Sequence, residues 1–300
     1  MSAIIIVWRV KMDWIKLLND SISYIEENLT GEISYETAAR IAGCSVYNYQ
    51  RMFSYITDKS LSEYIRSRRL TLAAFDLLNS DQRIIDISQK YGYESQDAFS
   101  RAFRNFHGVL PSTVRNETVQ LKSCPRLSFQ ITIKGVNHMN YQIEQWPAFK
   151  VMGVSYEMDT QRAPEIIPTV WENAWKEGIP GRLLENISDC RPAGLLGISD
   201  GDTTGHVDEM EYIIGVTSHV DVPDSKPVPV IEGMKEFSFP AAAWAVFEAN
   251  GKLPEAIQDT FKKIYSEWFP NSGYKPAALP EIECYIQDSR QEIWIAVEKK

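Results

Sequence analysis

Hydrophobic and polar positions follow a helical period through the first third of the chain. From residue 13 apolar side chains recur three and four positions apart, which predicts an amphipathic helix that ends near Asn28, before Gly31. Residues 61–78 show the same period and predict a longer helix of about 27 Å at 1.5 Å per residue. Residues 1–11 lie before this pattern, either as an extension or as the product of a misassigned start codon.

A second pattern occurs twice, once on each side of the long helix. In both copies a small residue is followed four positions later by a glycine, Gly43 or Gly92, and a serine after the turn, Ser45 or Ser95, is placed to cap the next helix. A small side chain lets two helices cross closely, and glycine permits the left-handed turn between them. Each copy therefore predicts a helix-turn-helix, and the helix between them is comparable in length with the ~34 Å that separates successive major-groove faces of B-DNA.

From residue 139 the pattern changes to short β-rich runs. The order strand, helix, strand, strand is predicted over residues 149–157, 164–177, 194–199 and 209–217, and again over residues 242–249, 254–269, 281–287 and 292–297. Such a duplicated unit leaves a groove where its halves meet, which is a natural place for a ligand. We thus predict two domains, an all-α double helix-turn-helix over residues 12–115 and an α+β duplicated βαββ domain over residues 139–300, joined by a linker over residues 116–138.

The predicted strand over residues 281–287 has two unlike faces. Its apolar face, with Ile282 and Cys284, is expected to meet a helix, whereas Glu281, Glu283 and Tyr285 are expected to face the groove. Carboxylates beside aromatic rings suit a cationic or amphipathic ligand. The aromatic residues of this half that either line the groove or belong to the core are Trp171, Trp175, Tyr212, Trp244 and Trp294.

Composition and charge refine this picture. With 300 residues, 44% of them hydrophobic, the chain can bury real cores, which excludes disordered, collagen-like and disulfide-scaffold proteins. The net charge of -9 alone argues against a polyanionic partner. However, residues 1–125 carry 15 Lys and Arg against 14 Asp and Glu, and residues 126–300 carry 16 against 26. The acidity therefore belongs to the second half and does not exclude DNA binding by the first.

The sequence contains little that points to catalysis or to metal binding. The four cysteines are widely spaced without a Cys-x-x-Cys pair, the four histidines are isolated, and no Gly-rich phosphate loop is found. We expect no catalytic residue, no metal and no cofactor. The chain lacks an apolar run of the ~20 residues that cross a bilayer, and its cysteine usage fits a reducing, cytoplasmic compartment.

The segments AARIAGCSVYNYQRMF, LSEYIRSRRL and DISQKYGYESQDAFSRAFRNFHGVLPSTVR resemble the AraC/XylS family of transcription regulators over about 100 residues. The resemblance implies that two helix-turn-helices bind DNA. Arg is suited to guanine, Gln to adenine, and Ser to either a donor or an acceptor. Arg104, like Arg66 and Arg115, either contacts phosphate or solvates an exposed face, and Asp97 either accepts from cytosine or balances the helix dipole. The base-reading residues that the resemblance implies are Tyr47, Gln50 and Arg51 in the first motif and Gln96, Ser100 and Arg101 in the second.

The second half resembles the GyrI-like domain, through YQIEQWPAFKVMGV, IPTVWENAW, FPAAAWAVFEANG and PEIECY. The resemblance implies an effector-binding domain in which Glu283 binds the cation of a ligand, with Tyr285 beside it. Trp171, Tyr212 and Trp244 are the candidate walls of the site.

These observations favour a sequence-specific DNA-binding transcription regulator, an activator rather than a repressor and not an enzyme. Its expected partners are double-stranded DNA, a small-molecule effector and, for an activator, RNA polymerase. One alternative is a small-molecule hydrolase in which Glu283 acts as base and Tyr285 as acid. The other is a protein-binding module that uses the acidic surface of the second half.

Overall fold

The computed structural model describes residues 2–116, 118–130, 139–187, 190–201, 208–223, 228–229, 231–286 and 290–300, with side chains from residue 14 onward. Its helices are α1 Ser2–Glu27, α2 Tyr35–Ala42, α3 Val46–Thr57, α4 Leu61–Asn79, α5 Ile84–Lys90, α6 Gln96–His107, α7 Pro111–Asn116, α8 Ala163–Lys176, α9 Ile179–Leu184, α10 Glu255–Lys263, the π-helical turn η1 Ile264–Trp268 and α11 Phe269–Asn271. Its strands are β1 Tyr141–Trp146, β2 Phe149–Asp159, β3 Leu195–Asp200, β4 Glu209–Val220, β5 Lys235–Phe239, β6 Ala242–Asn250, β7 Tyr274–Tyr285 and β8 Arg290–Lys299.

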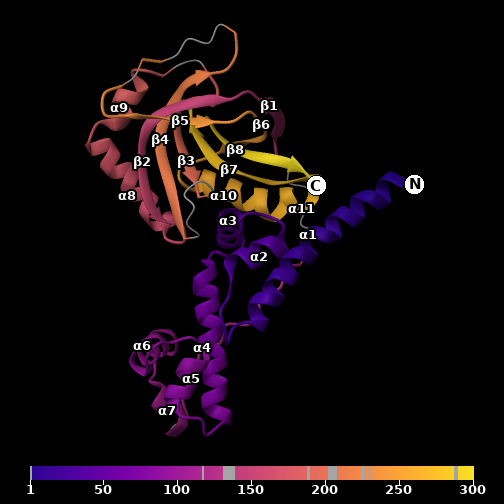
Figure 1. Ribbon diagram of the computed structural model, residues 1–300, viewed down its shortest axis with the longest axis vertical. Helices are drawn as coiled ribbons and strands as arrows, with labels where there is room; N and C mark the ends of the chain where they lie inside the picture. The colour runs from indigo at the N-terminus through magenta and orange to yellow at the C-terminus, as the bar shows by residue number, and fades with distance from the viewer. Residues whose placement is uncertain are drawn as a thin grey trace.

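Both predicted helix-turn-helices are present, as α2–α3 and α5–α6 at opposite ends of α4 (Figure 1). Gly43 and Gly92 have φ values of 77° and 79°, the left-handed conformation that each turn requires. The hydroxyls of Ser45 and Ser95 accept the backbone N–H three residues on, so each serine caps its recognition helix as predicted.

Two separate clusters of side chains hold the helical half together. The first motif packs α3 against α1 and α4 through residues such as Leu18, Ile22 and Phe53, and the second buries Phe99 and Phe103 of α6 against α4 and α5. α1 ends at Glu27, close to the predicted end, but begins at Ser2 and so includes residues for which the sequence predicts no element. None of the described helices is long and apolar enough to span a bilayer.

The second half contains the predicted α+β fold built on one antiparallel eight-stranded sheet in the order β1-β6-β8-β7-β3-β4-β2-β5. The units β2-α8-α9-β3-β4 and β6-α10-η1-α11-β7-β8 each have the predicted βαββ order, and they meet where β3 pairs with β7. Strands β1 and β5 were not predicted. They lie at the two edges of the sheet. Strand β1, which precedes the first unit, pairs with β6 of the second, and β5, which precedes the second unit, pairs with β2 of the first, so the arrangement is pseudo-two-fold.

The helices of this half cover one face of the sheet. Phe247 and Ile293 point toward α10 and η1, where they pack with Phe261. The expectation that the apolar face of β7 meets a helix is wrong. Ile282 and Cys284 pack in a cluster formed by residues of strands and loops. The sheet that carries them is strongly curved (Figure 1). The carboxylate face of β7 is therefore the face on the helical side.

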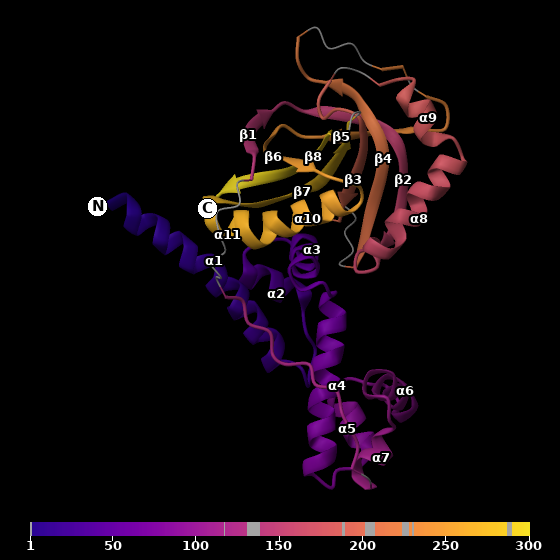
Figure 2. The ribbon, with the colours of Figure 1, turned by 180° about the vertical axis from the view of Figure 1, so that it is seen from behind.

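Residues 118–130 form neither helix nor strand, and Figure 2 shows them running along α1 and α4. Arg68 Nη1 donates to the Cys124 carbonyl at 2.6 Å, and the Leu127 N–H donates to the Tyr64 hydroxyl at 3.0 Å. This part of the predicted linker is therefore bound to the helical half. Residues 117 and 131–138 of the predicted linker lie outside the described residues.

The two halves contact each other directly. Trp14 of α1 stacks with Phe269 of α11 at 6.3 Å between ring centroids, and Tyr55 of α3 stacks with Phe261 of α10 at 4.8 Å. α3 consequently lies against α10, at the helical side of the sheet (Figure 1).

Candidate DNA-reading helices and effector groove

The recognition helix of the second motif, α6, presents its predicted reading side chains outward. Phe99 and Phe103 fasten one side of the helix to the core. On the other side Gln96 and Arg101 are exposed and Ser100 is half-buried. The predicted reading side of α6 is therefore at the surface of the protein.

The three arginines proposed to contact phosphate, together with Asp97, also lie at the surface of the helical half. Arg104, Arg66 and Asp97 are exposed. Arg115 is exposed too, but its guanidinium donates to the Gln82 carbonyl and so joins α7 to the segment before α5. Arg115 therefore has a structural contact that the others lack among the hydrogen bonds of the described residues.

The recognition helix of the first motif, α3, is covered by the second half of the chain. The exposed fractions of Tyr47, Gln50 and Arg51 are only 2%, 3% and 6%. The Tyr47 hydroxyl donates to the Ser199 carbonyl at 3.3 Å, and Gln50 Nε2 donates to Asp208 Oδ1 at 3.1 Å. All three predicted readers of this motif are thus engaged within the protein.

Arg51 forms the innermost of these contacts. Its Nε and Nη2 atoms donate to Oε2 of Glu281 at 2.9 and 2.5 Å, and the hydroxyl of Tyr265 donates to the other oxygen of the same carboxylate. The guanidinium carbon lies 5.0 Å from the ring centre of Tyr55 and 5.4 Å from that of Phe261, within cation–π distance. Burial by itself would lower the pKa of Arg51, but Glu281 raises it well above its ordinary value, so the guanidinium stays charged.

Glu283 lies two residues further along the same face of β7 and is also buried, with 8% of its surface exposed. The Tyr285 hydroxyl donates to its Oε2 atom at 2.5 Å. Burial raises the pKa of Glu283, and Glu281 adds to this rise, while the hydrogen bond from Tyr285 and the charge of Arg51 lower it in part. Two carboxylates, one paired with arginine and one with a phenol, therefore lie side by side beneath α3.

Aromatic residues close the groove on the α8 side. Trp171 Nε1 donates to the Tyr212 hydroxyl at 2.8 Å, and its ring meets Tyr285 edge-on at 5.2 Å. Next to them is an open apolar pocket of about 280 Å³. Its lining residues are Trp171, Trp175, Leu195, Leu253 and Tyr285.

The structure brings together four of the five predicted effector residues, Glu283, Tyr285, Trp171 and Tyr212. It places Trp244 elsewhere, on the opposite face of the sheet, where its ring packs at 6.1 Å from Phe149 and from Trp294. Because side chains alternate along β6, Trp244 points away from α10 whereas Phe247 points toward it. The sequence did not predict Leu195 and Leu253 in this pocket, since Leu253 precedes a proline in a loop that has no periodic pattern.

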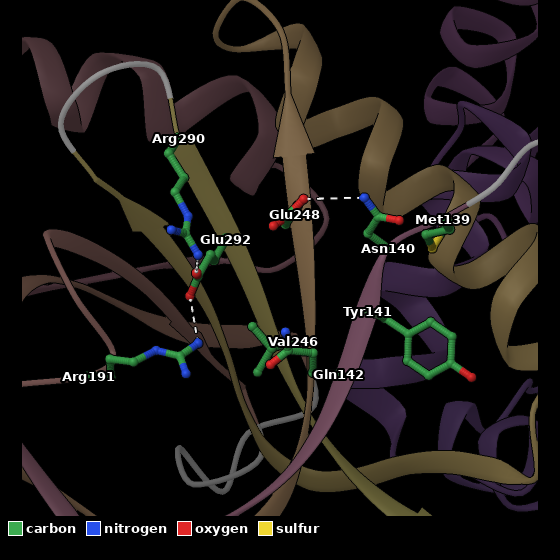
Figure 3. Close-up of a pocket in the computed structure, with 9 residues that line it drawn as sticks. All are labelled: Met139, Asn140, Tyr141, Gln142, Arg191, Val246, Glu248, Arg290 and Glu292. Atoms are coloured by element: carbon green, nitrogen blue, oxygen red, sulfur yellow. Dashed lines mark hydrogen bonds and ion pairs between the residues drawn. The ribbon is translucent and has the colours of Figure 1, made fainter.

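A second pocket, of about 570 Å³, lies on that opposite face of the sheet (Figure 3). Arg191 donates to Glu144 at 2.9 Å and to Glu292 at 3.1 Å, and Arg290 donates to Glu292 at 2.9 Å. The guanidinium groups drawn in Figure 3 are therefore already paired, and none of the predicted effector residues lines this pocket.

Comparison with known proteins identifies both halves. The GyrI-like small molecule binding domain matches residues 139–298, and a helix-turn-helix domain matches residues 38–117. The regulatory protein SoxS of Escherichia coli K12 is 39% identical over 101 residues, which are 34% of this chain and 94% of SoxS. The multiple antibiotic resistance protein MarA of the same strain is 36% identical over 106 residues, 35% of this chain and 84% of MarA.

Among solved structures, that of SAV2435 bound to tetraphenylphosphonium is similar to part of this chain. It is 23% identical and has a TM-score of 0.45, with 53% of this chain and 94% of that chain covered. The matches to SoxS and MarA span nearly the whole of those proteins, and the GyrI-like match spans more than half of this chain. The chain is therefore a DNA-binding transcription regulator of the AraC/XylS family that carries a GyrI-like small-molecule-binding domain at its C-terminal end.

Proposed function

We propose that this regulator senses a cationic, amphipathic small molecule in the groove between α8 and α10. The observation that supports this proposal is the buried carboxylate of Glu283, which lies beside Tyr285 and next to the apolar pocket bounded by Trp171. In such surroundings little water screens a charge, so a cation gains more from the carboxylate than it would at the surface. Aromatic walls add cation–π attraction and bury the apolar part of the ligand.

Tetraphenylphosphonium is a suitable probe, because it combines a delocalised positive charge with four phenyl rings. We expect calorimetric titration to detect binding to the full chain. Glu283→Gln should weaken it at least about tenfold, since removing one partner of a buried ion pair costs ~3–5 kcal/mol and a tenfold change is only ~1.4 kcal/mol. Neutral triphenylphosphine oxide, which has similar rings, should bind much more weakly. Glu172→Gln is the matched control, because Glu172 is an exposed carboxylate on α8 that pairs only with Lys176 among the described ion pairs. Equal binding of the cation by Glu283→Gln and by the unaltered chain would refute the proposal.

We propose further that residues 12–115 form the DNA-binding unit and residues 139–300 the effector-binding unit. In this proposal α3 and α6 enter successive segments of the major groove, with Tyr47, Gln50 and Arg51 reading bases from α3. Gln96, Ser100 and Arg101 read bases from α6, and Arg104 contacts phosphate. The exposure of Gln96 and Arg101 supports this assignment for α6.

Arg101→Ala tests the assignment, because the Arg101 side chain is exposed and forms no hydrogen bond or ion pair with the described residues. The full chain is first used to enrich a duplex from a random-sequence pool. The substitution should then weaken binding to that duplex by ~1–3 kcal/mol. Lys176→Ala, which removes one positive charge from the distant helix α8, should leave the affinity unchanged. Unaltered affinity of the Arg101→Ala chain in a gel-shift titration would contradict the role of this arginine.

We also propose activation of transcription, with RNA polymerase as the protein partner, and binding of the effector without turnover. A reporter gene behind the enriched duplex should be expressed more strongly when the regulator is present. Incubation with the probe should release no product. Repression of the reporter, or conversion of the probe that is lost in Glu283→Gln, would contradict these two proposals respectively.

A further inference from the structure

The two recognition helices of this chain are equivalent in sequence but not in surroundings. At an offset of 50 residues Arg51 of α3 corresponds to Arg101 of α6. Arg101 is exposed, whereas Arg51 is 6% exposed and bound to a carboxylate 230 residues further along the chain. The difference arises because the GyrI-like domain covers α3 and leaves α6 open.

The surface that covers α3 presents the chemistry of a cation site. Glu281 accepts both hydrogen bonds from the Arg51 guanidinium, and Phe261 of α10 lies against the guanidinium at cation–π distance. The neighbouring carboxylate, Glu283, also lies within the electrostatic reach of Arg51. The proposed cationic effector would bind through a carboxylate and aromatic rings, and Arg51 already makes both kinds of contact with this surface.

We propose that Arg51 is an internal occupant of the effector groove, and that a cationic effector displaces it and thereby releases α3 for DNA. The proposal rests on the proposed function, in that the effector is a cation and α3 reads DNA. Side chains that are held by Glu281, Asp208 and Ser199 cannot at the same time reach base edges in a major groove. The docked arrangement is therefore an autoinhibited state with respect to the first half of the DNA site.

The docking of α3 on the GyrI-like domain also depends on a close contact between Tyr47 and Gly201. The ring of Tyr47 lies so near Gly201, just after β3, that a Cβ atom on Gly201 would come 2.1 Å from a ring carbon. Gly201 has no positive φ, so alanine fits the backbone there but not beneath a docked α3. Gly201→Ala should therefore weaken the docking of α3 without altering either Arg51 or the carboxylates.

Competition between Arg51 and the cation for the same carboxylates determines whether a variant binds the cation more tightly or more weakly. When only a fraction of the protein molecules is in the state that can bind a ligand, the apparent affinity for that ligand is reduced by that fraction. Weakening the docking of α3 should therefore tighten binding of tetraphenylphosphonium. Removal of the Arg51 charge can by itself favour a nearby cation, so the Gly201→Ala variant, which keeps that charge, is needed to detect release of the helix.

The test is calorimetric titration of the full-length chain with tetraphenylphosphonium. Arg51→Ala and Gly201→Ala should each lower the dissociation constant at least about fivefold. Two matched controls should leave it unchanged: Arg40→Ala, which removes an exposed charge from α2, and Gly181→Ala, whose added Cβ meets no atom within 4 Å. Circular dichroism checks that each variant is folded. Arg51→Ala removes the partner of the Glu281 carboxylate. This carboxylate can become solvated when α3 undocks, so the variant need not keep it buried and unpaired.

Unchanged affinity in both variants would overturn the proposal. A gain in Arg51→Ala alone would also contradict it, because it would report only the loss of a nearby positive charge and not release of the helix. If no form of the chain binds the probe, the proposed effector class fails, and the inference is then judged by DNA affinity. A tighter complex of Gly201→Ala with the enriched duplex supports autoinhibition, and an unchanged one overturns it.

Discussion

Glu283 shows how burial sets the chemistry of a single residue. The carboxylate lies beneath α3 with 8% of its surface exposed, and burial is the largest cause of its raised pKa. The exclusion of water from around the carboxylate has two consequences. It strengthens attraction to a cation, and it makes the carboxylate easier to protonate than an exposed glutamate.

We therefore predict that cation binding weakens at mildly acidic pH. The ordinary glutamate pKa is 4.5, and the pKa of Glu283 lies above it, so the negative charge is lost at a higher pH than at an exposed glutamate. Titrations with tetraphenylphosphonium from about pH 8 to about pH 5 should show a falling affinity. Burial raises the pKa of Tyr285 well above its ordinary value, so this phenol keeps its proton over the whole range.

Glu283→Gln is the control for this pH dependence. The variant should bind weakly and show a much flatter profile, because its amide does not titrate. An affinity of the unaltered chain that stays constant down to the range of ordinary carboxyl groups would contradict the prediction.

At the scale of elements, local signals in the sequence predicted the helical half well. Gly43 and Gly92 marked the turns, and Ser45 and Ser95 marked the helix starts, because capping and left-handed turns depend on residues that are close in sequence. Strands β1 and β5 escaped prediction for the opposite reason. They are short edge strands whose partners, β6 and β2, lie far away in the chain, so no local pattern announces them.

The sheet also shows where an alternating pattern stops being informative. Alternation correctly separated Ile282 and Cys284 from Glu281 and Glu283, but it did not say which face the helices cover. Apolar residues of a curved sheet can pack on one another, and here they do. The polar face was then left for helices that bury the carboxylates with aromatic residues such as Tyr265.

The caps lead to a prediction for α6. The Ser95 hydroxyl accepts the Ala98 N–H at 3.1 Å, so Ser95→Ala should reduce the free energy of unfolding of the helical half by ~1 kcal/mol. Ser95→Asn, which can still cap the helix, should be close to the unaltered chain. Urea denaturation followed by circular dichroism measures both. Equal stability of the alanine and asparagine variants would show that the cap does not stabilise the helix.

At the scale of the whole molecule, the uneven charge acquires a structural meaning. The acidic second half places Glu281 and Asp208 against α3 of the first, so it engages Arg51 and Gln50, two of the side chains that we propose read DNA. No sequence pattern indicates this pairing, because Arg51 and Glu281 are 230 residues apart and each fits its own family motif. The sequence named candidate residues for each half separately, and the contact between Arg51 and Glu281 becomes visible only in the three-dimensional structure.

If the effector and DNA both favour the undocked arrangement, binding of either ligand must strengthen binding of the other to the same extent. The most direct measurement is the dissociation constant of the full chain for the enriched duplex, with and without saturating tetraphenylphosphonium, at one fixed salt concentration. We expect binding at least about fivefold tighter with the cation, and a Gly201→Ala chain that binds tightly without it. DNA affinity that is unchanged or weakened by the cation would contradict the release of α3 by the effector.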